Sequence, residues 1–402
     1  MRPFSHVIPL DEARAILAAA ARPLTRVERV ELAALSHRVL AEDVVADADV
    51  PPFARAMMDG YAVQAADTAG ASRDTPRRLI VAGRVFTGEV FPGHVAGGSC
   101  VEIATGAPLP AGADAVVMVE DTLPGPDGHV DIATGVSPGQ HVGRAGADIL
   151  RGSTVLRAGD WLLPSRVGVL AAQGRTAADV VARPRVAIVS TGNEVVAPGQ
   201  PLGPGQIYDI NRHTLAAVAV RHGAVPVTLD VAGDTLEALD RAVDAAIQCD
   251  VVVFSGGSSV GDRDLVLDVL RRRGAVAFHG VATRPGKPTA FGHIDGVPVF
   301  GMPGNPTSCL TNAYVLLAPF LRRMAGLPPE RPHVVQAPLT RRISSGAGRH
   351  QFYTVRLVEG GAEPAFKASG DITSMAHADG YLEIAADVTA VEAGTLVDVV
   401  LF

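Results

Sequence analysis

Cysteine is scarce in this chain of 402 residues, and the spacing of the few cysteines argues against two kinds of site. Cys100, Cys249 and Cys309 are odd in number and far apart, and no CxxC or CxxxC pair occurs. Neither a disulfide framework nor a metal site built from several thiolates fits that pattern. We therefore expect a protein of a reducing compartment, the cytoplasm.

Long apolar runs and long basic runs are also missing. No apolar run reaches the roughly 18 residues of a membrane span, and Asp11, Glu12 and Arg14 interrupt any signal-peptide core. The net charge of -7 and the pI of about 5.9 argue against nucleic acid or an anionic membrane as the main partner. A small anionic ligand in a local pocket remains compatible with this composition.

Lysine is almost absent, because Lys287 and Lys367 are the only lysines among 35 basic residues. A lysine kept in a chain that otherwise uses arginine can mark a site that needs a compact ammonium group. We apply this interpretation to Lys287 and attribute Lys367 to chance.

The length favours two to four domains, and the texture of the sequence changes along the chain. Residues 10–20 predict a helix, and residues 27–32 and 38–45 predict strands or a second short helix. Short β-prone runs between glycines and prolines then predict an inserted all-β module that ends near residue 139. Residues 143–150 and 156–170 resume a mixed pattern, which we expect to pack on the first helix.

Strand and helix patterns alternate in residues 183–326, which is typical of a parallel α/β domain. We expect strands at 185–190, 225–231, 251–254 and 275–281, and helices at 211–222, with Asn211 as its cap, 234–248, 265–273 and 307–324. Asp295-Gly296 predicts a type I′ hairpin between residues 289–294 and 297–300. The residues after Pro329 alternate in short runs and predict a small β-barrel or sandwich.

Four loops of the α/β block carry the chemistry: STGNE (190–194), SGGSSVGDRD (255–264), RPGKP (284–288) and GMPGNPTS (301–308). Parallel strands bring such loops to one edge of the sheet, where ligands of open α/β folds bind. Backbone amides and hydroxyls of the second loop would cradle a phosphate or oxyanion, and the alternative is a structural turn. No Walker motif is present, so a P-loop NTPase is excluded. The residues of the cradle are Gly256, Gly257, Ser258 and Ser259.

Carboxylates next to an anion site predict a hard cation such as Mg²⁺. Asp262 and Asp264 each have a second interpretation, as the N-cap of the following helix. We choose Asp264 as the metal ligand. Asp234 also has a structural interpretation, because Asp234 and Glu237 have the spacing of a helix capping box. For Glu194 in its loop no structural role requires a carboxylate.

Two cations, Arg284 and Lys287, flank Pro-Gly, a rigid turn that suits an oxyanion; a solvated cationic turn is the alternative. In the β module, Asp59 follows two methionines, Thr105 lies in a Gly/Pro loop, and Asp148 belongs to GADIL. Each of these three is a weak signal by itself.

Taken together, the motifs resemble the molybdopterin molybdenumtransferase family, which includes the gephyrin E domain. The segments that carry this resemblance are PPFARAMMDGYAV, ATGAPLPAGADAVV, GADIL, VAIVSTGNEV, SGGSSVGDRDLV, RPGKPTAFG, VFGMPGNPTS and SGDITSMAHADGY. The family departs from this chain in having lysine at the position of Arg284 and an apolar residue at that of Ser258. The resemblance implies insertion of molybdate into adenylylated molybdopterin with release of AMP.

The fold that the resemblance implies is a multi-domain α/β plus β protein. Its parts are a discontinuous N-terminal α/β linker domain (1–50 and 140–182), an inserted β domain (51–139), a molybdopterin-binding α/β domain with a mostly parallel sheet (183–326), and a C-terminal β-barrel (327–402). A homodimer is implied, in which the Asp59 module of one subunit completes the site of the other. We also expect contact with a molybdopterin adenylyltransferase.

The resemblance also implies roles for residues. The catalytic positions are Asp59, Asp148, Glu194, Asp234, Asp264 and Lys287. As a mechanistic hypothesis of our own, Mg²⁺ is held by Asp234, Asp264 and Glu194, and Asp59 or Glu194 acts as the acid–base group. Lys287 matches a lysine linked to molybdate. The substrate contacts are Thr105, Thr191, Gly256, Gly257, Ser258, Ser259, Arg284, Pro303, Gly304, Asn305, Ser308, Arg349 and Ser374.

Three alternatives stay open at this point. The α/β block by itself suits a molybdopterin adenylyltransferase, and gephyrin illustrates a non-catalytic dimeric scaffold. Tungstate and molybdate are nearly the same size, so the sequence does not separate them.

Overall fold

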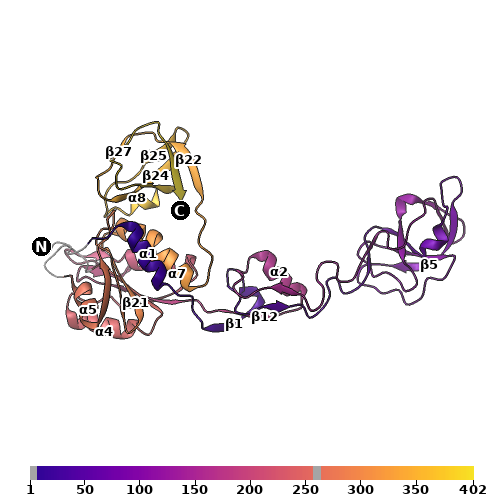
Figure 1. Cartoon of the computed structure of the whole chain (residues 1–402), viewed down its shortest axis with the longest axis horizontal. Helices are drawn as coiled ribbons and strands as arrows, with labels where there is room; N and C mark the ends of the chain where they lie inside the picture. The colour runs from indigo at the N-terminus through magenta and orange to yellow at the C-terminus, as the bar shows by residue number, and fades with distance from the viewer. Residues whose placement is uncertain (1–6, 257–263) are drawn as a thin grey trace. The chain divides into compact units, whose positions relative to one another are not determined.

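The computed structural model of the protein describes residues 7–256 and 264–402, and its contacts divide the chain into two units. The first unit comprises Met1–Arg29, His37–Val39 and Asp179–Phe402, and the second comprises Val30–Ser36 and Leu40–Ala178. The chain passes between them along the two strands β1 (Val27–Glu31) and β12 (Ala177–Val181), which pair with each other (Figure 1). No helix of the described residues is long and apolar enough to cross a membrane.

The first unit is built on a six-stranded sheet that is mostly parallel, as predicted. Three parallel pairings join its first four strands, and β20 runs antiparallel to both of its neighbours. Asp295 and Gly296 both have positive φ, as a type I′ turn requires, so the predicted hairpin is confirmed. The strand order is β16 (Val225–Thr228), β13 (Arg185–Ser190), β17 (Val251–Ser255), β21 (Val297–Met302), β20 (Ala290–Ile294) and β18 (Gly274–His279).

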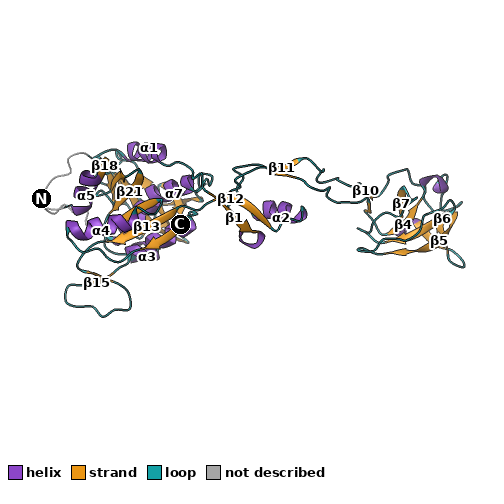
Figure 2. Ribbon diagram, turned by 90° about the horizontal axis from the view of Figure 1, so that it is seen from below, coloured by secondary structure: helices purple, strands orange, loops and turns teal. Residues whose placement is uncertain are grey.

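Helices cover both faces of this sheet because its strands alternate apolar side chains between the two faces. Val186 and Ile188 face one helical layer, and Ala187 and Val189 face the other. The first layer contains α1 (Leu10–Ala20), α3 (Asn211–Arg221), α6 (Pro306–Asn312), the π-helical segment η4 (Ala313–Leu317) and α7 (Ala318–Met324). The second contains α4 (Leu236–Ala246) and α5 (Leu265–Arg273) (Figure 2).

The first helix, α1, packs differently from our expectation. Its buried residues Leu10, Ala13 and Leu17 join the core on the α3 and α7 face of the sheet, rather than packing with residues 143–170. The reason is its apolar stripe, which fits a sheet face already lined by Phe291 and Phe300.

The C-terminal residues of the first unit form a second six-stranded sheet. Closure of this sheet into the predicted barrel is not confirmed. Its strand order is β19 (Thr283–Arg284), β24 (His350–Val358), β26 (Gly380–Ile384), β28 (Leu396–Leu401) and β22 (Val334–Pro338), with β25 (Gly361–Pro364) beside β24. Smaller elements of the unit are β14 (Val195–Val196) with β15 (Ile207–Tyr208), β23 (Ile343–Ser344) with β27 (Ala390–Val391), and α8 (Thr373–Ala376).

The second unit contains the predicted β-rich segment. Its main sheet has the order β7 (Ala115–Met118), β4 (Gly60–Val63), β6 (Ser99–Ile103), β5 (Arg77–Val85), β9 (His129–Ile132) and β8 (Thr122–Pro124), with an apolar core on each face. Its other elements are the pairs β10 (Val142–Gly143) with β3 (Arg55–Ala56) and β11 (Thr154–Leu156) with β2 (Val44–Val45), helix α2 (Pro164–Ala172), and the 3-10 turns η1 (Leu32–Ala34), η2 (Ala65–Thr68) and η3 (Val119–Asp121). The division of the whole chain into four domains stays a prediction.

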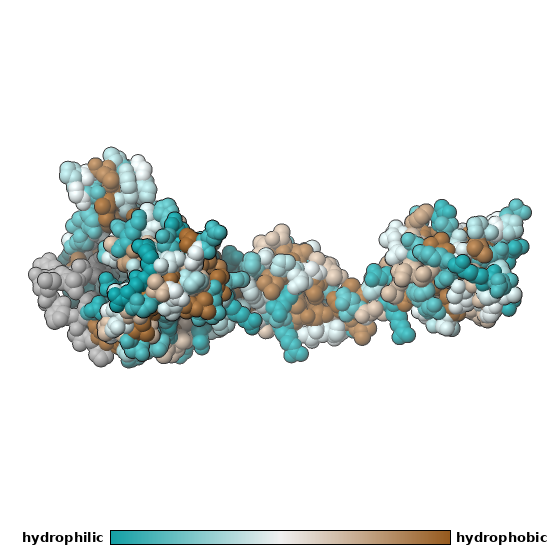
Figure 3. Space-filling view, turned by 90° about the horizontal axis from the view of Figure 1, so that it is seen from above, coloured by the Kyte–Doolittle hydropathy of each residue, from teal (hydrophilic) through white to brown (hydrophobic). Residues whose placement is uncertain are grey.

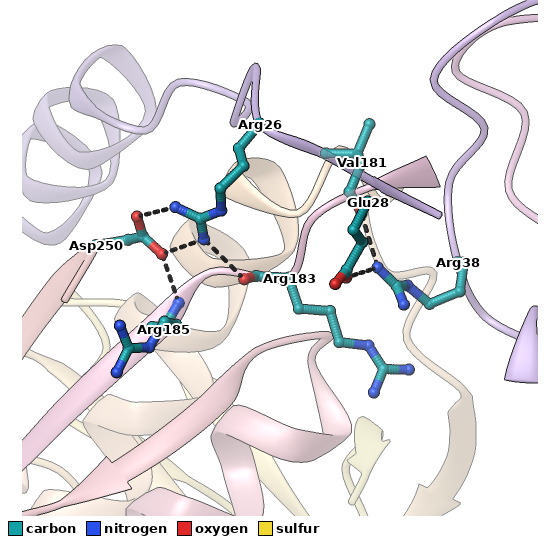
Figure 4. Close-up of polar contacts among 7 residues, drawn as sticks. All are labelled: Arg26, Glu28, Arg38, Val181, Arg183, Arg185 and Asp250. Carbon is teal, nitrogen blue, oxygen red and sulfur yellow. Dashed lines mark hydrogen bonds and ion pairs between the residues drawn. The ribbon is translucent and has the colours of Figure 1, made fainter. Parts of the chain in front are cut away.

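An ion-pair network fastens strands β1 and β12 to the α/β sheet (Figure 4). Arg26 donates to both oxygens of Asp250, at 3.1 and 2.9 Å, and Asp250 also accepts from the backbone amide of Arg185 at 2.7 Å. Arg38 connects the two strands, because it pairs with Glu28 of β1 and donates to the carbonyl of Val181 of β12 at 3.0 Å. Asp250 thereby fixes the residues that begin β1 to the first residue of β13.

This network predicts a pH-dependent stability. Burial alone would raise the pKa of Asp250, but the hydrogen bonds from Arg26 and Arg185 and their charges outweigh it and lower the pKa below its ordinary value of 3.8. The ionised Asp250 therefore stabilises the fold above that value, and the contribution is lost as the pH falls through the lower folded-state pKa.

We expect Asp250→Asn to cost about 1 kcal/mol of unfolding free energy at pH 7, because the side chain of Arg26 is half exposed. The difference from the wild type should shrink toward zero near the acid limit of folding, measured by denaturant unfolding across pH. Asp179→Asn, which breaks an exposed pair with Arg29, is the control and should change little. A loss that is independent of pH would contradict the charge assignment.

Candidate active site

The four predicted loops start from one edge of the α/β sheet. Ser190, Ser255 and Met302 end their strands in the same register, so the loops after β13, β17 and β21 start at one level. The loop between β18 and β20 reaches the same edge, because His279 pairs with Ala290 and Ala290 pairs with Gly301. The prediction that the four loops leave one edge of the sheet is confirmed for the strand ends, and a single site built from them stays a prediction.

Gly256, at the start of the second loop, is in close contact with two of the other loops. Its φ is +93°, and a Cβ atom there would lie 2.5 Å from the carbonyl oxygen of Thr191. A Cβ on Gly304 would lie 3.4 Å from the Cα of Gly256. The amide of Thr191 in turn donates to the carbonyl of Ser255 at 2.9 Å. The three loops thus meet backbone to backbone, and a side chain at Gly256 would separate them.

The side chain of Asn211 stabilises the same contact between loops. The prediction that Asn211 caps its helix is wrong. The cap position of α3 is Ile210, and Asn211 is the buried first residue of the helix. Its Nδ2 donates to the Ser255 hydroxyl at 2.7 Å and to the Gly304 carbonyl at 2.8 Å. A buried carbonyl at a strand end needs a donor, and this need outweighs the local preference of asparagine for a helix end.

Asn193 links Asp234, one carboxylate of the predicted metal site, to the loop that carries Glu194. The amide of Asn193 donates to Asp234 at 3.1 Å, and the amide of Asp234 donates back to the Asn193 side chain at 3.3 Å. The carboxylate of Glu194 folds back over Gly192 of its own loop. The capping-box alternative for Asp234 is wrong, because Thr235 caps α4 by accepting from the amide of Ala238.

The third predicted ligand, Asp264, has two intramolecular contacts. One carboxylate oxygen accepts from the amide of Leu267 at 3.0 Å and caps α5, and the other lies 3.1 Å from Nε2 of His279. Sequence reasoning missed His279, although its place at the end of the strand before the RPGKP loop was a usable signal. The predicted residues Gly257, Ser258 and Ser259, and the alternative cap Asp262, lie outside the described residues.

Strand pairing joins the RPGKP loop to the C-terminal sheet. β19 and β24 are parallel neighbours, with Thr283 opposite His350 and Arg284 opposite Gln351. Arg349, which directly precedes β24, therefore lies beside the chain segment that carries Arg284 and Lys287. The two segments are about 60 residues apart in the sequence, and the pairing of β19 with β24 brings their backbones side by side.

A second contact connects the GMPGNPTS loop to the segment before α8. The side chain of Asn305 donates to Ser369 at 3.0 Å, and Thr307 donates to the carbonyls of Ser369 and Asp371. Ser308 is buried on α6, next to the predicted residues Pro303 and Gly304. Ser374 is fully buried and accepts from the amide of Lys367, so it shapes this segment from inside.

The predicted residues of the second unit form a pair and a separate residue. Asp59 accepts from both the amide and the hydroxyl of Thr105, at 2.7 and 2.8 Å. These two hydrogen bonds, the backbone one first, lower the pKa of Asp59, which is therefore ionised at neutral pH. Met57 and Met58 beside it are exposed, and Asp148 is exposed on its own turn.

Comparison with known proteins agrees with this architecture. Three family models match the chain: MoeA N-terminal region (domain I and II) over residues 8–174, probable molybdopterin binding domain over 187–323, and MoeA C-terminal region (domain IV) over 336–402. Molybdopterin molybdenumtransferase 2 of Mycobacterium tuberculosis is 39% identical over 391 residues, which cover 94% of this chain and 95% of that protein. The chain belongs to the molybdopterin molybdenumtransferase family.

Other relatives agree. Molybdopterin molybdenumtransferase of Haemophilus influenzae is 34% identical and covers 86% of this chain and 85% of its own length. The crystal structure of the molybdopterin biosynthesis MoeA protein from Pyrococcus horikosii matches with a TM-score of 0.86 at 40% identity, over 98% of this chain and 99% of that one. The resemblance drawn from the motifs is confirmed over nearly the whole chain.

The close packing at Gly256 predicts the effect of a single methyl group. Gly256→Ala should lower the melting temperature strongly, because it adds both an unfavourable φ and an overlap with the Thr191 carbonyl. Gly199→Ala is the matched control: its φ is +92°, but nothing lies within 4 Å of a Cβ there, so only a backbone strain of about 1–2 kcal/mol remains. Equal destabilisation of the two variants, measured by calorimetry, would contradict the close contact.

Proposed function

We propose that the protein inserts molybdate into adenylylated molybdopterin and releases AMP, as a step of molybdenum cofactor biosynthesis. The observation that carries the proposal is the set of four loops at one sheet edge, with carboxylates on two loops and cations on another. Family membership supports the reaction type, since the curated relatives bear the name of that transferase.

The substrate would bind by its phosphates and by its dithiolene. Backbone donors of the Gly256 to Ser259 loop, together with Thr191 and the loop from Pro303 to Ser308, would hold the adenylyl group. Molybdate, as the second substrate, would bind at Arg284 and Lys287, with Arg349 beside them through the β19–β24 pairing. The dithiolene sulfurs would ligate molybdenum, so the three cysteines of the chain, all buried, take no part.

The donor set bears on the proposed Mg²⁺. Among residues 7–256 and 264–402 no three acidic, histidine or cysteine side chains gather closely enough for a metal cage. A Mg²⁺ ion that completes its shell with phosphate oxygens and water needs only one or two carboxylates, which Asp264 and the Asp234–Glu194 loops would supply. When bound, it would polarise the phosphoanhydride and stabilise charge on the leaving phosphate.

The hydrogen bonds of Asp59 support a choice between the two candidates for acid–base chemistry, Asp59 and Glu194. Asp59 has a lowered pKa because Thr105 donates to it twice, which moves its pKa away from neutrality and disfavours proton transfer at neutral pH. We therefore assign proton transfer to Glu194 and a hydrogen-bond-accepting role to Asp59 and to Asp148.

We further propose a homodimer in the cytoplasm that receives its substrate from a molybdopterin adenylyltransferase. An apolar depression on the second unit supports the dimer, because such a surface favours contact with another protein. Apolar residues are exposed on that part of the molecule in Figure 3. The lining residues are Glu31, Leu32, Ala33, Ser36, Pro164, Val167 and Thr176.

A direct assay tests the reaction. With adenylylated molybdopterin, molybdate and Mg²⁺, we expect AMP release that depends on molybdate. With molybdopterin, Mg²⁺ and ATP instead, an adenylyltransferase would consume ATP, and that outcome would overturn the proposal. A stoichiometric protein partner in the absence of turnover would favour a scaffold role instead.

The metal assignment has its own prediction. Asp264→Asn should reduce AMP release at least about 100-fold, whereas the melting temperature should change little because asparagine is also a good N-cap. Asp268→Asn removes the same charge one turn further along α5 and serves as the control, with activity near that of the wild type. Unchanged turnover in Asp264→Asn would show that this carboxylate is not a ligand.

A further inference from the structure

The loop that carries Arg284 and Lys287 is closed by its own backbone. The amide of Gly280 donates to the carbonyl of Thr289 at 2.9 Å. The carbonyl of Lys287 accepts twice, from the amides of Val281 at 3.0 Å and Thr289 at 2.9 Å. These bonds hold the Lys287–Pro288 peptide, whereas the carbonyl of Gly286 is held by other groups.

Two buried side chains hold that carbonyl. Asn312 and Thr289 are both fully buried, and both donate to the Gly286 carbonyl, at 2.7 and 2.9 Å. Asn312 also donates to the Thr289 hydroxyl at 2.6 Å. The hydroxyl gives its one proton to Gly286 and accepts from Asn312, so the three groups form a closed triangle of hydrogen bonds.

Gly286 fits this triangle only without a side chain. Its φ is +103°, and a Cβ atom would lie 2.4 Å from both Nδ2 and Oδ1 of Asn312. The amide of Asn312 therefore packs directly against the Cα of Gly286, next to Lys287. This contact leaves the loop little freedom to move relative to α6.

Helix α6 links this loop to another part of the site. It begins directly after the Pro303–Asn305 turn and ends at Asn312, where the backbone widens into the π-helical segment η4. Such π segments are often found at functional sites. One short helix thus connects the proposed phosphate loop at its start with the cation loop at its end.

Efficient packing alone does not explain why residue 312 is a polar asparagine, because burying its side-chain oxygen is unfavourable. Its Oδ1 is buried without a hydrogen-bond partner among the described residues. An apolar side chain of similar size would fill the space without leaving an unpaired acceptor. The benefit of asparagine is instead directional, because its Nδ2 holds both the carbonyl and the hydroxyl of the loop.

We propose that Asn312 and Thr289 are positioning residues that preset the cation loop for an oxyanion, with neither of them touching the anion. This inference rests on the proposed function, which places molybdate at Arg284 and Lys287. By holding the Gly286 carbonyl, the triangle fixes the backbone from which both cations extend, so that binding requires no rearrangement of the loop.

The test compares two substitutions of Thr289 in the full-length protein. Thr289→Val keeps the shape and removes the hydroxyl, whereas Thr289→Ser keeps the hydroxyl and removes a methyl group. For Thr289→Val we expect the KM for molybdate and the Kd from titration calorimetry to rise about tenfold, the equivalent of one lost hydrogen bond. The KM for adenylylated molybdopterin and kcat at saturating molybdate should stay near wild type, and Thr289→Ser should restore molybdate affinity.

Hydrogen exchange of the 284–288 backbone gives a readout that does not depend on activity. It should become faster in Thr289→Val and in Asn312→Asp, which turns a donor toward the Gly286 carbonyl into an acceptor. If both Thr289 variants bind molybdate as the wild type does, or both lose affinity equally, the positioning role is wrong while the proposed function stands. If the wild type itself binds no molybdate, the proposed function fails and the inference fails with it.

Discussion

The common register of three strand ends is the constraint on which the rest of the site depends. Ser190, Ser255 and Met302 stop at one level because β13, β17 and β21 are paired in parallel without a shift. Buried alternating side chains on both faces hold that register, since a slip by one residue would turn Val186 and Ile188 toward the wrong helical layer. The loops can approach as closely as Gly256 and Thr191 do only because they start from the same edge.

Buried amide side chains hold the loops in the positions that the sheet gives them. Asn211 reaches up from α3 to the second and fourth loops, and Asn312 reaches from α6 to the third. Each supplies donors to carbonyls that no strand can pair, because the chain turns away from the sheet there. The two asparagines therefore supply, through their side chains, the hydrogen-bond donors that neighbouring strands supply within the sheet.

Charge is distributed between the loops rather than concentrated in one cluster. Asp234 is bound through Asn193, Asp264 is shared between a helix amide and His279, and the cations lie on the loop beside β24. Asp234 and Asp264 are each held by a residue from another loop or strand, Asn193 and His279, so both carboxylates already have protein partners before any ligand binds. Such an arrangement leaves the joining of the charges to a substrate with several anionic groups.

The sequence by itself determined the alternation of strands and helices in the α/β block, the Asp295-Gly296 hairpin, the edge where the loops gather and the family. These follow from local periodicity, from turn chemistry and from motifs that are short and continuous. The sequence could not distinguish helix caps from buried hydrogen-bond donors. Asn211 was expected to cap its helix but donates hydrogen bonds in the core, and Asp234 was considered as a cap but is not one. Both choices depend on what lies opposite the side chain.

The tertiary structure alone decided which distant residues meet. The pairing of β19 with β24, the triangle of Asn312, Thr289 and Gly286, and the contact of His279 with Asp264 join segments whose spacing in the chain carries no periodic signal. Hydrogen bonds between such segments form because a buried carbonyl or carboxylate must find a donor wherever the packed elements provide one. Local sequence sets the elements, and the satisfaction of buried polar groups between them sets the site.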